Sequence, residues 1–127
     1  MFEAAAYGRF GALRAILDRD PAQANAMSPD GFTPLHLACF GGGAEATALV
    51  VDRGADLETV STAKIAQVRP LETAAFSGDL QSARVLLEAG ADRNGEGSGG
   101  STPMQTAVAN GNEKLIALLE SFGADAG

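Results

Sequence analysis

The chain has 127 residues, of which 46% are hydrophobic and 20% charged, a composition that suits one folded domain and excludes a disordered chain. Its formal net charge of −7 argues against nucleic acid and anionic membranes as partners, because both bind Lys and Arg, and favours a partner protein with a basic face. The single cysteine, Cys39, excludes an internal disulfide and is typical of a reducing compartment. Glu3 lies where a signal peptide carries positive charge, and no apolar run reaches transmembrane length, so we expect a cytoplasmic protein.

Four segments with one pattern follow each other along the chain, and each predicts two short helices joined by a tight turn. In each segment two apolar stretches flank a glycine, and the first stretch is rich in alanine. In chain order they are AAAYGRFGALRAIL at 4–17, LACFGGGAEATALVVDRGAD at 37–56, TAAFSGDLQSARVLLEAGAD at 73–92 and TAVANGNEKLIALLESFGAD at 106–125.

Short markers recur in the same phase within these segments. The flanked glycine, where we expect the tight turn, recurs every 33 to 36 residues, as Gly8, Gly42, Gly78 and Gly111. A proline expected at the first helical position recurs as Pro34, Pro70 and Pro103. Thr33 and Thr102 stand directly before two of these prolines, where helix N-caps belong. Units of this size cannot bury an apolar face alone, so we expect them to stack.

This pattern resembles the ankyrin repeat. The resemblance is carried by DGFTPLHLACFGG at 30–42 and VLLEAGADRN at 85–94, and it covers almost the whole chain. It implies an all-α ankyrin-repeat solenoid, in which each unit is two antiparallel helices followed by a hairpin-like loop. We expect one domain over residues 1–127, with no second domain, divided into repeats at about 1–29, 30–65, 66–98 and 99–127.

The residues that could carry chemistry have structural roles in this pattern. The resemblance implies that His36 caps the start of its helix together with Thr33, and Glu72 and Gln105 occupy the corresponding positions and could also cap. Cys39 stands where other units have Ala or Val, which fits a small buried thiol rather than a nucleophile. A general base at His36 would need a nucleophile or carboxylate around it. We therefore expect no catalytic residue, no cofactor and no metal site.

A glycine-rich stretch, GEGSGGSTP at residues 95–103, raises the alternative of a nucleotide-binding enzyme. Gly95, Gly97 and Gly100 have the spacing G-x-G-x-x-G, and glycine loops that open helices can bind phosphate. A dinucleotide site needs a buried strand before the glycines, and a P-loop needs a lysine where Ser101 follows Gly100. The repeat register makes this stretch a loop between two units that offers little side-chain contact, so the enzyme is the less favoured alternative.

Positions that the repeat leaves variable predict a partner-binding groove. The resemblance implies that the two residues before each marker glycine line a concave surface, which places Phe40 and Phe76 there in successive units. The alternative is that both rings pack between repeats as core. From the groove and the loop tip before the second unit, the predicted partner-binding residues are Tyr7, Met27, Asp30, Phe32, Phe40, Phe76, Ser77 and Asn110. We therefore expect a non-catalytic protein-protein interaction module that works as a monomer, and the sequence leaves open whether it is an adaptor, an inhibitor or an accessory subunit.

The loop LETVSTAKIAQVRP at residues 57–70 departs from the repeat. It makes its interval three residues longer than the shortest one, and it has AQVR where Asp-Gly-x-Thr is expected. Ile65 and Val68 in this loop are either docked back onto the protein or offered to a partner. A further alternative function, self-association into a homo-oligomer, would use this loop or the groove.

Overall fold

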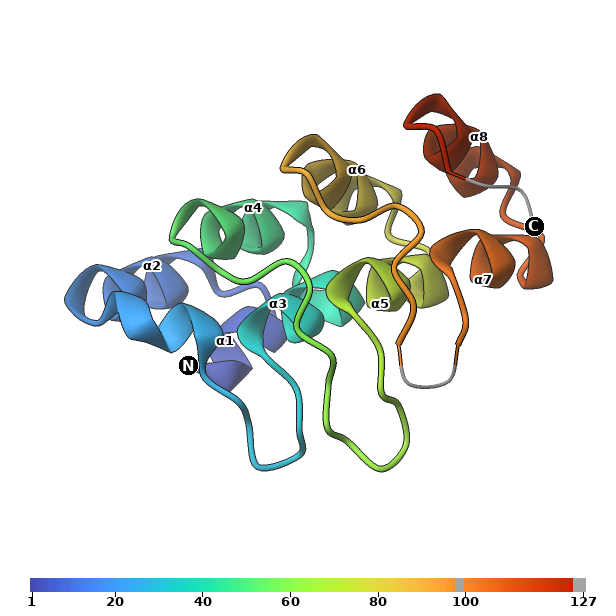
Figure 1. Cartoon of the computed structure of the whole chain (residues 1–127). Helices are drawn as coiled ribbons and strands as arrows, with labels where there is room; N and C mark the ends of the chain where they lie inside the picture. Colours follow the sequence, from blue (N-terminus) through green and yellow to red (C-terminus); the bar gives the residue numbers. More distant parts are fainter. Residues whose placement is uncertain (98–99, 125–127) are drawn as a thin grey trace.

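The computed structural model describes residues 1–97 and 100–124, and its helices form two layers (Figure 1). One layer contains α1 (Phe2–Ala6), α3 (Pro34–Leu37), α5 (Pro70–Ser77) and α7 (Pro103–Ala109). The other contains α2 (Phe10–Arg19), α4 (Ala44–Asp52), α6 (Leu80–Glu88) and α8 (Glu113–Ser121). A 3₁₀ turn, η1 (Pro21–Asn25), follows α2, and a π turn, η2 (Ala38–Gly42), continues α3. The predicted all-α solenoid is confirmed for this part of the chain.

Each helix pair packs on the next one along the chain. In the first layer α1 contacts α3, and α5 contacts both η2 and α7, while in the second layer α4 contacts α2 and α6. The connecting loops leave the first layer on one side and follow each other along the array (Figure 1). No helix within residues 1–97 and 100–124 is both long and apolar enough to cross a membrane.

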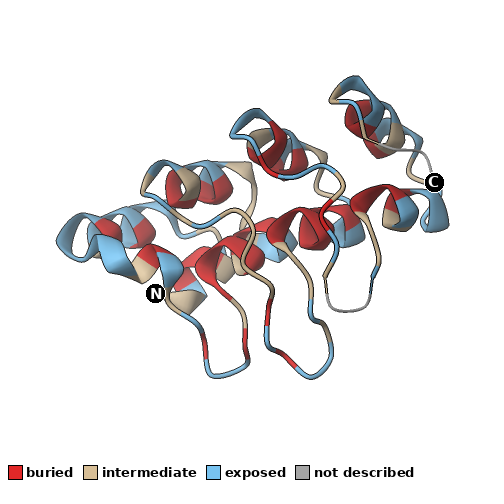
Figure 2. Ribbon diagram, viewed as in Figure 1, coloured by how far each residue is buried: buried red, intermediate tan, exposed pale blue. Residues whose placement is uncertain are grey.

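The core lies between the two layers and between successive units (Figure 2). The fully buried large aliphatic side chains are Leu13, Leu17, Leu35, Val50, Leu86, Leu115 and Leu119. Alanines are fully buried in the first layer, at Ala5, Ala38, Ala74, Ala75 and Ala107. Small side chains allow neighbouring helices to approach closely, which explains the alanines at these positions.

Two helix starts are closed by the predicted caps. Thr33 Oγ1 accepts a hydrogen bond from the backbone N–H of His36, and His36 Nδ1 accepts one from the N–H of Thr33, both at 3.3 Å. Thr102 and Gln105 repeat this reciprocal arrangement before α7, at 3.2 and 3.0 Å. Such a cap stabilises a helix by about 1 kcal/mol, because it pairs N–H groups that the helix leaves without a partner.

His36 also connects its helix to the next loop. Its Nε2 lies 2.7 Å from the carbonyl oxygen of Val68, and its Nδ1 lies 2.7 Å from the hydroxyl of Thr33. With Nε2 donating and Nδ1 accepting, both nitrogens of a neutral ring are used. Burial lowers the pKa of His36 below its ordinary value of 6.5, and the bond to Val68 opposes this shift. The structural role expected for His36 is confirmed.

The marker glycine of the second unit does not make the expected turn. In the other three units the marker glycine has a φ between 65° and 76°, as a tight turn requires. In the second unit the π turn carries the helix further: the N–H of Gly43 donates to the carbonyl of Ala38 at 3.0 Å, and Gly43 takes a φ of 91°. Gly42 is needed for a different reason, because a Cβ there would collide with the carbonyl oxygen of Ala5 in α1.

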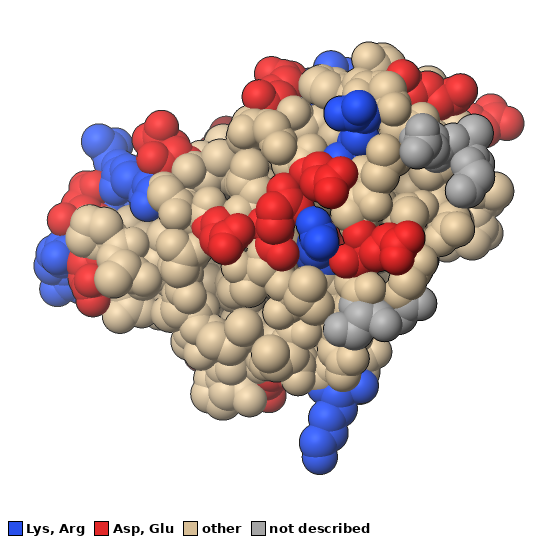
Figure 3. All heavy atoms as spheres, in the orientation of Figure 1, with Lys and Arg blue, Asp and Glu red and all other residues tan. Residues whose placement is uncertain are grey.

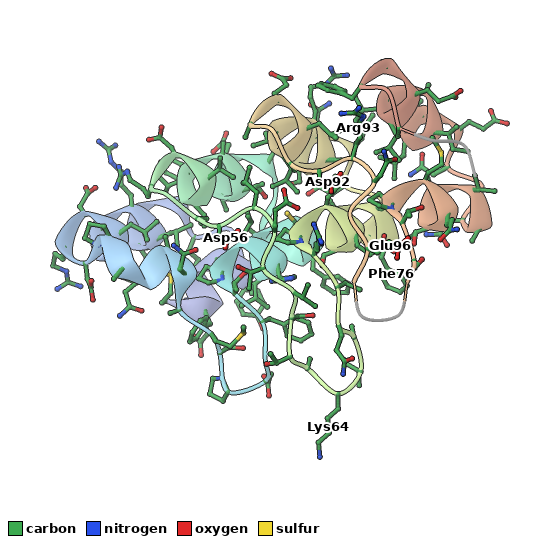
Figure 4. All side chains as sticks on the ribbon, in the orientation of Figure 1. Asp56, Lys64, Phe76, Asp92, Arg93 and Glu96 are labelled. Atoms are coloured by element: carbon green, nitrogen blue, oxygen red, sulfur yellow. The ribbon has the colours of Figure 1, made fainter. Side chains whose placement is uncertain are left out.

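One buried serine shapes the long loop between α4 and α5. The Ser61 hydroxyl donates to the carbonyl of Ala66 at 2.7 Å and accepts from the N–H of Val68 at 2.9 Å. The Ser61 N–H donates to the carbonyl of Val68, also at 2.9 Å. These bonds close the loop into a narrow projection with Lys64 near its tip (Figure 4). Val68 is thus docked onto the protein, whereas Ile65 is 90% exposed.

Neighbouring loops approach each other through glycine. A Cβ at Gly31 would collide with the backbone of Ala63 in the next loop, and a Cβ at Gly97 would collide with the carbonyl oxygen of Gln67. Glycine at these two positions therefore allows backbone to pack directly on backbone. Gly97 belongs to the glycine-rich stretch, whose residues 98–99 lie outside the described part of the chain.

Candidate functional site

A groove of about 530 Å³ opens between the first-layer helices of the second and third units and the loops that precede them. Its apolar walls are formed by Phe32, Leu37, Phe40, Ile65, Val68 and Phe76. Its polar groups come from Asp30, His36, Glu72 and Thr73. A concave, mostly apolar surface with a few polar groups has the character of a binding site.

Phe40 and Phe76 form the most exposed apolar surface of this groove after Ile65. Their side chains are 61% and 66% exposed, and their rings stack with centroids 6.5 Å apart and planes inclined by 16°. Phe40 lies in the π turn η2. Phe76, labelled in Figure 4, lies in the last turn of α5. The alternative in which both rings pack between repeats as core is therefore wrong for this structure.

The structure brings together four of the eight residues predicted to bind a partner. These are Asp30, Phe32, Phe40 and Phe76, which all line the groove. Asp30 and Phe32 enter from the loop before α3, so one wall of the groove is a loop and the other is helical.

The other four predicted residues lie outside the groove lining. Tyr7 is 71% exposed after α1, and Met27 is 41% exposed in the loop before α3. The Ser77 hydroxyl donates to the carbonyl of Cys39 at 2.8 Å, so this side chain joins α5 to η2. Asn110 is exposed at the end of α7. Their positions in the repeat therefore do not bring these four residues into the groove.

Glu72 is the buried acid of the groove. It is 5% exposed, and burial raises the pKa of its carboxyl above the ordinary value of 4.5, while a hydrogen bond from the Thr106 hydroxyl opposes this shift. Thr106 donates to Oε1, and Oε2 has no hydrogen-bond partner among the described residues. Glu72 was one of two side chains that could cap in the place of His36, and it does not, because no side chain caps the start of α5.

Arg69 is the N-cap residue of α5. It takes the place of the threonine of the two capped units, so the hydroxyl half of the reciprocal cap is missing here. Its guanidinium instead forms ion pairs with Glu58 at 3.2 Å and Asp92 at 3.8 Å, and its Nε donates to the carbonyl of Glu96 at 3.0 Å. Acidic side chains accordingly gather around a basic one on the face shown in Figure 3. The arginine at this position is the sequence signal that α5 lacks the reciprocal threonine cap.

The charged residues that line the groove are acidic. Asp30 and Glu72 are its charged lining residues, and no Lys or Arg of the described chain is among them. Arg69, close in sequence to Glu72, is committed to Glu58 and Asp92 instead. The groove therefore presents apolar surface with acidic groups at two positions.

The Cys39 thiol and the His36 ring have structural roles. Burial raises the pKa of the Cys39 thiol to about 12, so it stays protonated at neutral pH. His36 uses both ring nitrogens in hydrogen bonds. Within residues 1–97 and 100–124, no three His, Cys, Asp or Glu side chains converge as metal ligands would.

Comparisons with known proteins agree with this architecture. A family model described as ankyrin repeats, in three copies, matches residues 1–96. A probable E3 ubiquitin-protein ligase of Oryza sativa subsp. japonica is 37% identical over 93 residues, which cover 72% of this chain and 20% of that protein. The B-cell lymphoma 3 protein homolog of Mus musculus is 34% identical over 98 residues, covering 77% of this chain and 21% of that protein.

A third relative is the neurogenic locus notch homolog protein 1 of Homo sapiens, which is 36% identical over 118 residues, covering 81% of this chain and 4% of that protein. The chain therefore corresponds to between 4% and 21% of the length of these three relatives. Stacked helix pairs, reciprocal threonine caps and the match over residues 1–96 lead to one conclusion. The chain belongs to the ankyrin-repeat family.

Proposed function

We propose that the chain is a non-catalytic interaction module that docks a partner protein into the groove beside Phe40 and Phe76. Ankyrin repeats are generally protein-interaction modules, which supports this class of function. The observation that carries the proposal is the stacked pair of rings, 61% and 66% exposed, on a groove wall. Burying one such ring is worth about 1.5 to 3 kcal/mol, so a partner that covers both gains a central anchor.

The remaining predicted residues would surround this anchor. Asp30 and Phe32 extend the groove on its loop side, and Tyr7, Met27, Ser77 and Asn110 belong to the rim of the proposed interface. A polar rim around a few buried aromatic anchors is the usual arrangement of a protein interface. In this proposal the protein is cytoplasmic and monomeric, and its partner is a protein with a basic face, which complements the formal net charge of −7.

Affinity capture from the source lysate tests the proposal with three baits. They are the wild type, the double variant Phe40→Ala/Phe76→Ala, and Val108→Ala as matched control, because Val108 is 57% exposed but does not line the groove. We expect proteins retained by the wild type and the control to be lost from the double variant. Retention of the same proteins by all three baits, with each bait folded by circular dichroism, would place the interface elsewhere.

Self-association is a second candidate function, because Ile65 is 90% exposed on the projecting loop. An apolar side chain so exposed could pack against a second copy of the chain. Light scattering across a concentration series distinguishes the two functions. A concentration-dependent oligomer that Ile65→Ser abolishes would support self-association, and a monomer at every concentration would exclude it.

A further inference from the structure

Glu72 holds a hydrogen-bond acceptor that the described chain does not pair. The residue is 5% exposed, its Oε1 accepts from Thr106, and its Oε2 is shielded from water without a donor. Buried polar atoms are nearly always paired in folded proteins. Because Glu72 lines the groove, a ligand in the groove is the natural source of the missing donor.

The equivalent side chains of the neighbouring units have no such atom. His36 uses both of its ring nitrogens, and the Gln105 side chain caps the N–H of Thr102. The third unit, which has Arg69 in place of the threonine, leaves Glu72 outside a cap, and its helix α5 contributes Glu72, Thr73 and Phe76 to the groove. The unpaired oxygen is thus confined to the place where a partner would dock.

The missing donor is most favourably a cation. Asp30 and Glu72 are the charged groups of the lining, and within the described chain no Lys or Arg lies among them. A charged donor forms shorter and stronger hydrogen bonds with a carboxylate than a neutral donor does. It would pair Oε2 and offset the negative charge of the groove in the same contact.

The aromatic rings favour a planar cation. Glu72 and Phe76 are four residues apart on α5, so they lie one turn apart on the same helix face. Phe76 is 66% exposed although it stacks with Phe40. A guanidinium packs flat on an aromatic ring and still directs N–H groups sideways, whereas an ammonium is a compact point charge.

We infer, building on the proposed function, that the partner inserts an arginine side chain into this groove, where the guanidinium donates to Glu72 Oε2 and packs on the Phe76 ring. Because Oε2 is shielded from water, neighbouring side chains must move aside as the arginine enters.

A displayed library of random twelve-residue peptides, selected on the full chain, tests the inference in its first stage. Peptides are kept for analysis when they bind the wild type and Val108→Ala but not Phe40→Ala/Phe76→Ala. We expect arginine to be enriched at one position of these peptides, next to apolar residues.

The second stage replaces that arginine by citrulline, which keeps the shape of the side chain and removes its charge. We expect the dissociation constant for the wild type to rise about 10- to 100-fold, since a hydrogen bond between charged groups is lost. On Glu72→Gln the same replacement should change the dissociation constant less than about threefold, because its partner is already absent. Glu120→Gln, an exposed acid of α8, is the matched control and should respond like the wild type.

The outcomes separate the inference from the proposed function. A library without any peptide sensitive to Phe40→Ala/Phe76→Ala overturns the proposed function and the inference with it. Groove-dependent peptides without an enriched arginine overturn the inference alone, and so does equal affinity for a lysine peptide. If Glu72→Gln does not fold, the wild-type response to citrulline still decides whether the arginine charge matters, and an unchanged affinity contradicts the inference.

Discussion

The second and third units begin their first helices with TPLH at 33–36 and RPLE at 69–72, and they use the last residue of each sequence in opposite ways. His36 closes a cap and holds the next loop, so all its polar atoms serve the fold. Glu72 closes no cap and keeps one carboxylate oxygen unpaired within the described chain. The two sequences differ at their first and last residues, and the unit that has Arg69 and Glu72 in place of threonine and histidine lacks the reciprocal cap.

This comparison also separates stability from recognition within one repeat position. A residue held in a cap stabilises its unit and offers little to a ligand, because its hydrogen bonds are already made. A buried acid without a full set of partners weakens its unit and retains the capacity to bind a donor. In the second unit His36 stabilises the fold, and in the third unit Glu72 keeps an acceptor for a ligand. Both residues line the groove between the two units.

The largest effect is expected from His36→Ala, which should lower the free energy of unfolding by about 2 to 4 kcal/mol. The substitution removes a cap and leaves the Val68 carbonyl without its donor. Urea denaturation measures the loss. His36→Gln is the control, because Gln105 closes the equivalent cap before α7, and it should cost about half as much or less. Equal losses would show that ring packing, not hydrogen bonding, matters at this position.

A pH dependence specific to the second unit is the next largest effect. The pKa of His36 is lowered in the folded chain, so the unfolded chain takes up the proton first. Below pH 6.5 the wild type should therefore lose stability relative to His36→Gln as the pH falls, until the folded pKa is reached. The slope is at most about 1.4 kcal/mol per pH unit. Urea titrations of both proteins between pH 5 and 8 measure the difference, and a constant difference would contradict the prediction.

Converting the third unit into a copy of the second should have a smaller effect of opposite sign. Arg69→Thr/Glu72→His adds a cap and removes the unpaired oxygen, while it breaks partly exposed ion pairs that are worth little. We expect a net gain of about 1 kcal/mol in thermal or urea unfolding, together with loss of any arginine-dependent binding. A double variant less stable than the wild type would mean that the ion pairs of Arg69 outweigh a cap.

The smallest effect on stability is expected at the groove itself. Phe76→Ala should change the free energy of unfolding by about 0.5 kcal/mol or less, because the ring is 66% exposed. Leu86→Ala, at a fully buried position of α6, is the contrasting control and should cost about 2 to 5 kcal/mol. Comparable losses in the two variants would show that Phe76 belongs to the core.

The fold could be read from the sequence because its signals are local and repeated. The caps at Thr33 and Thr102 involve a partner three residues away, glycine marks the same place in each unit, and proline marks the same place in the last three. The turn of the second unit was misplaced by one residue because Gly42 and Gly43 are both able to make it. The contact of Gly42 with Ala5, which decides between them, is between units.

The site was predicted only in part, since its remaining determinants are distant in sequence. Glu72 bonds to Thr106, 34 residues further on, and no local pattern shows that contact. Ile65 joins the groove because Ser61 fixes the shape of its loop through three hydrogen bonds. Ser77 shares its repeat position with Asn110, yet its hydroxyl is taken by the Cys39 carbonyl, which register alone cannot show.

Direct backbone packing between the loops has a mechanical consequence for the groove. The Thr62 N–H donates to the Gly31 carbonyl at 2.8 Å, and Gly97 lies close enough to Gln67 that a Cβ would collide with the Gln67 carbonyl oxygen. No side chain separates these backbones, so the spacing of the loops is set by main-chain atoms alone. Gly31 and Gly97 permit this close approach because they have no side chain. A methyl group at either position would push two neighbouring loops apart and so shift the groove wall that carries Ile65. The width of the groove is therefore controlled from positions that do not line it.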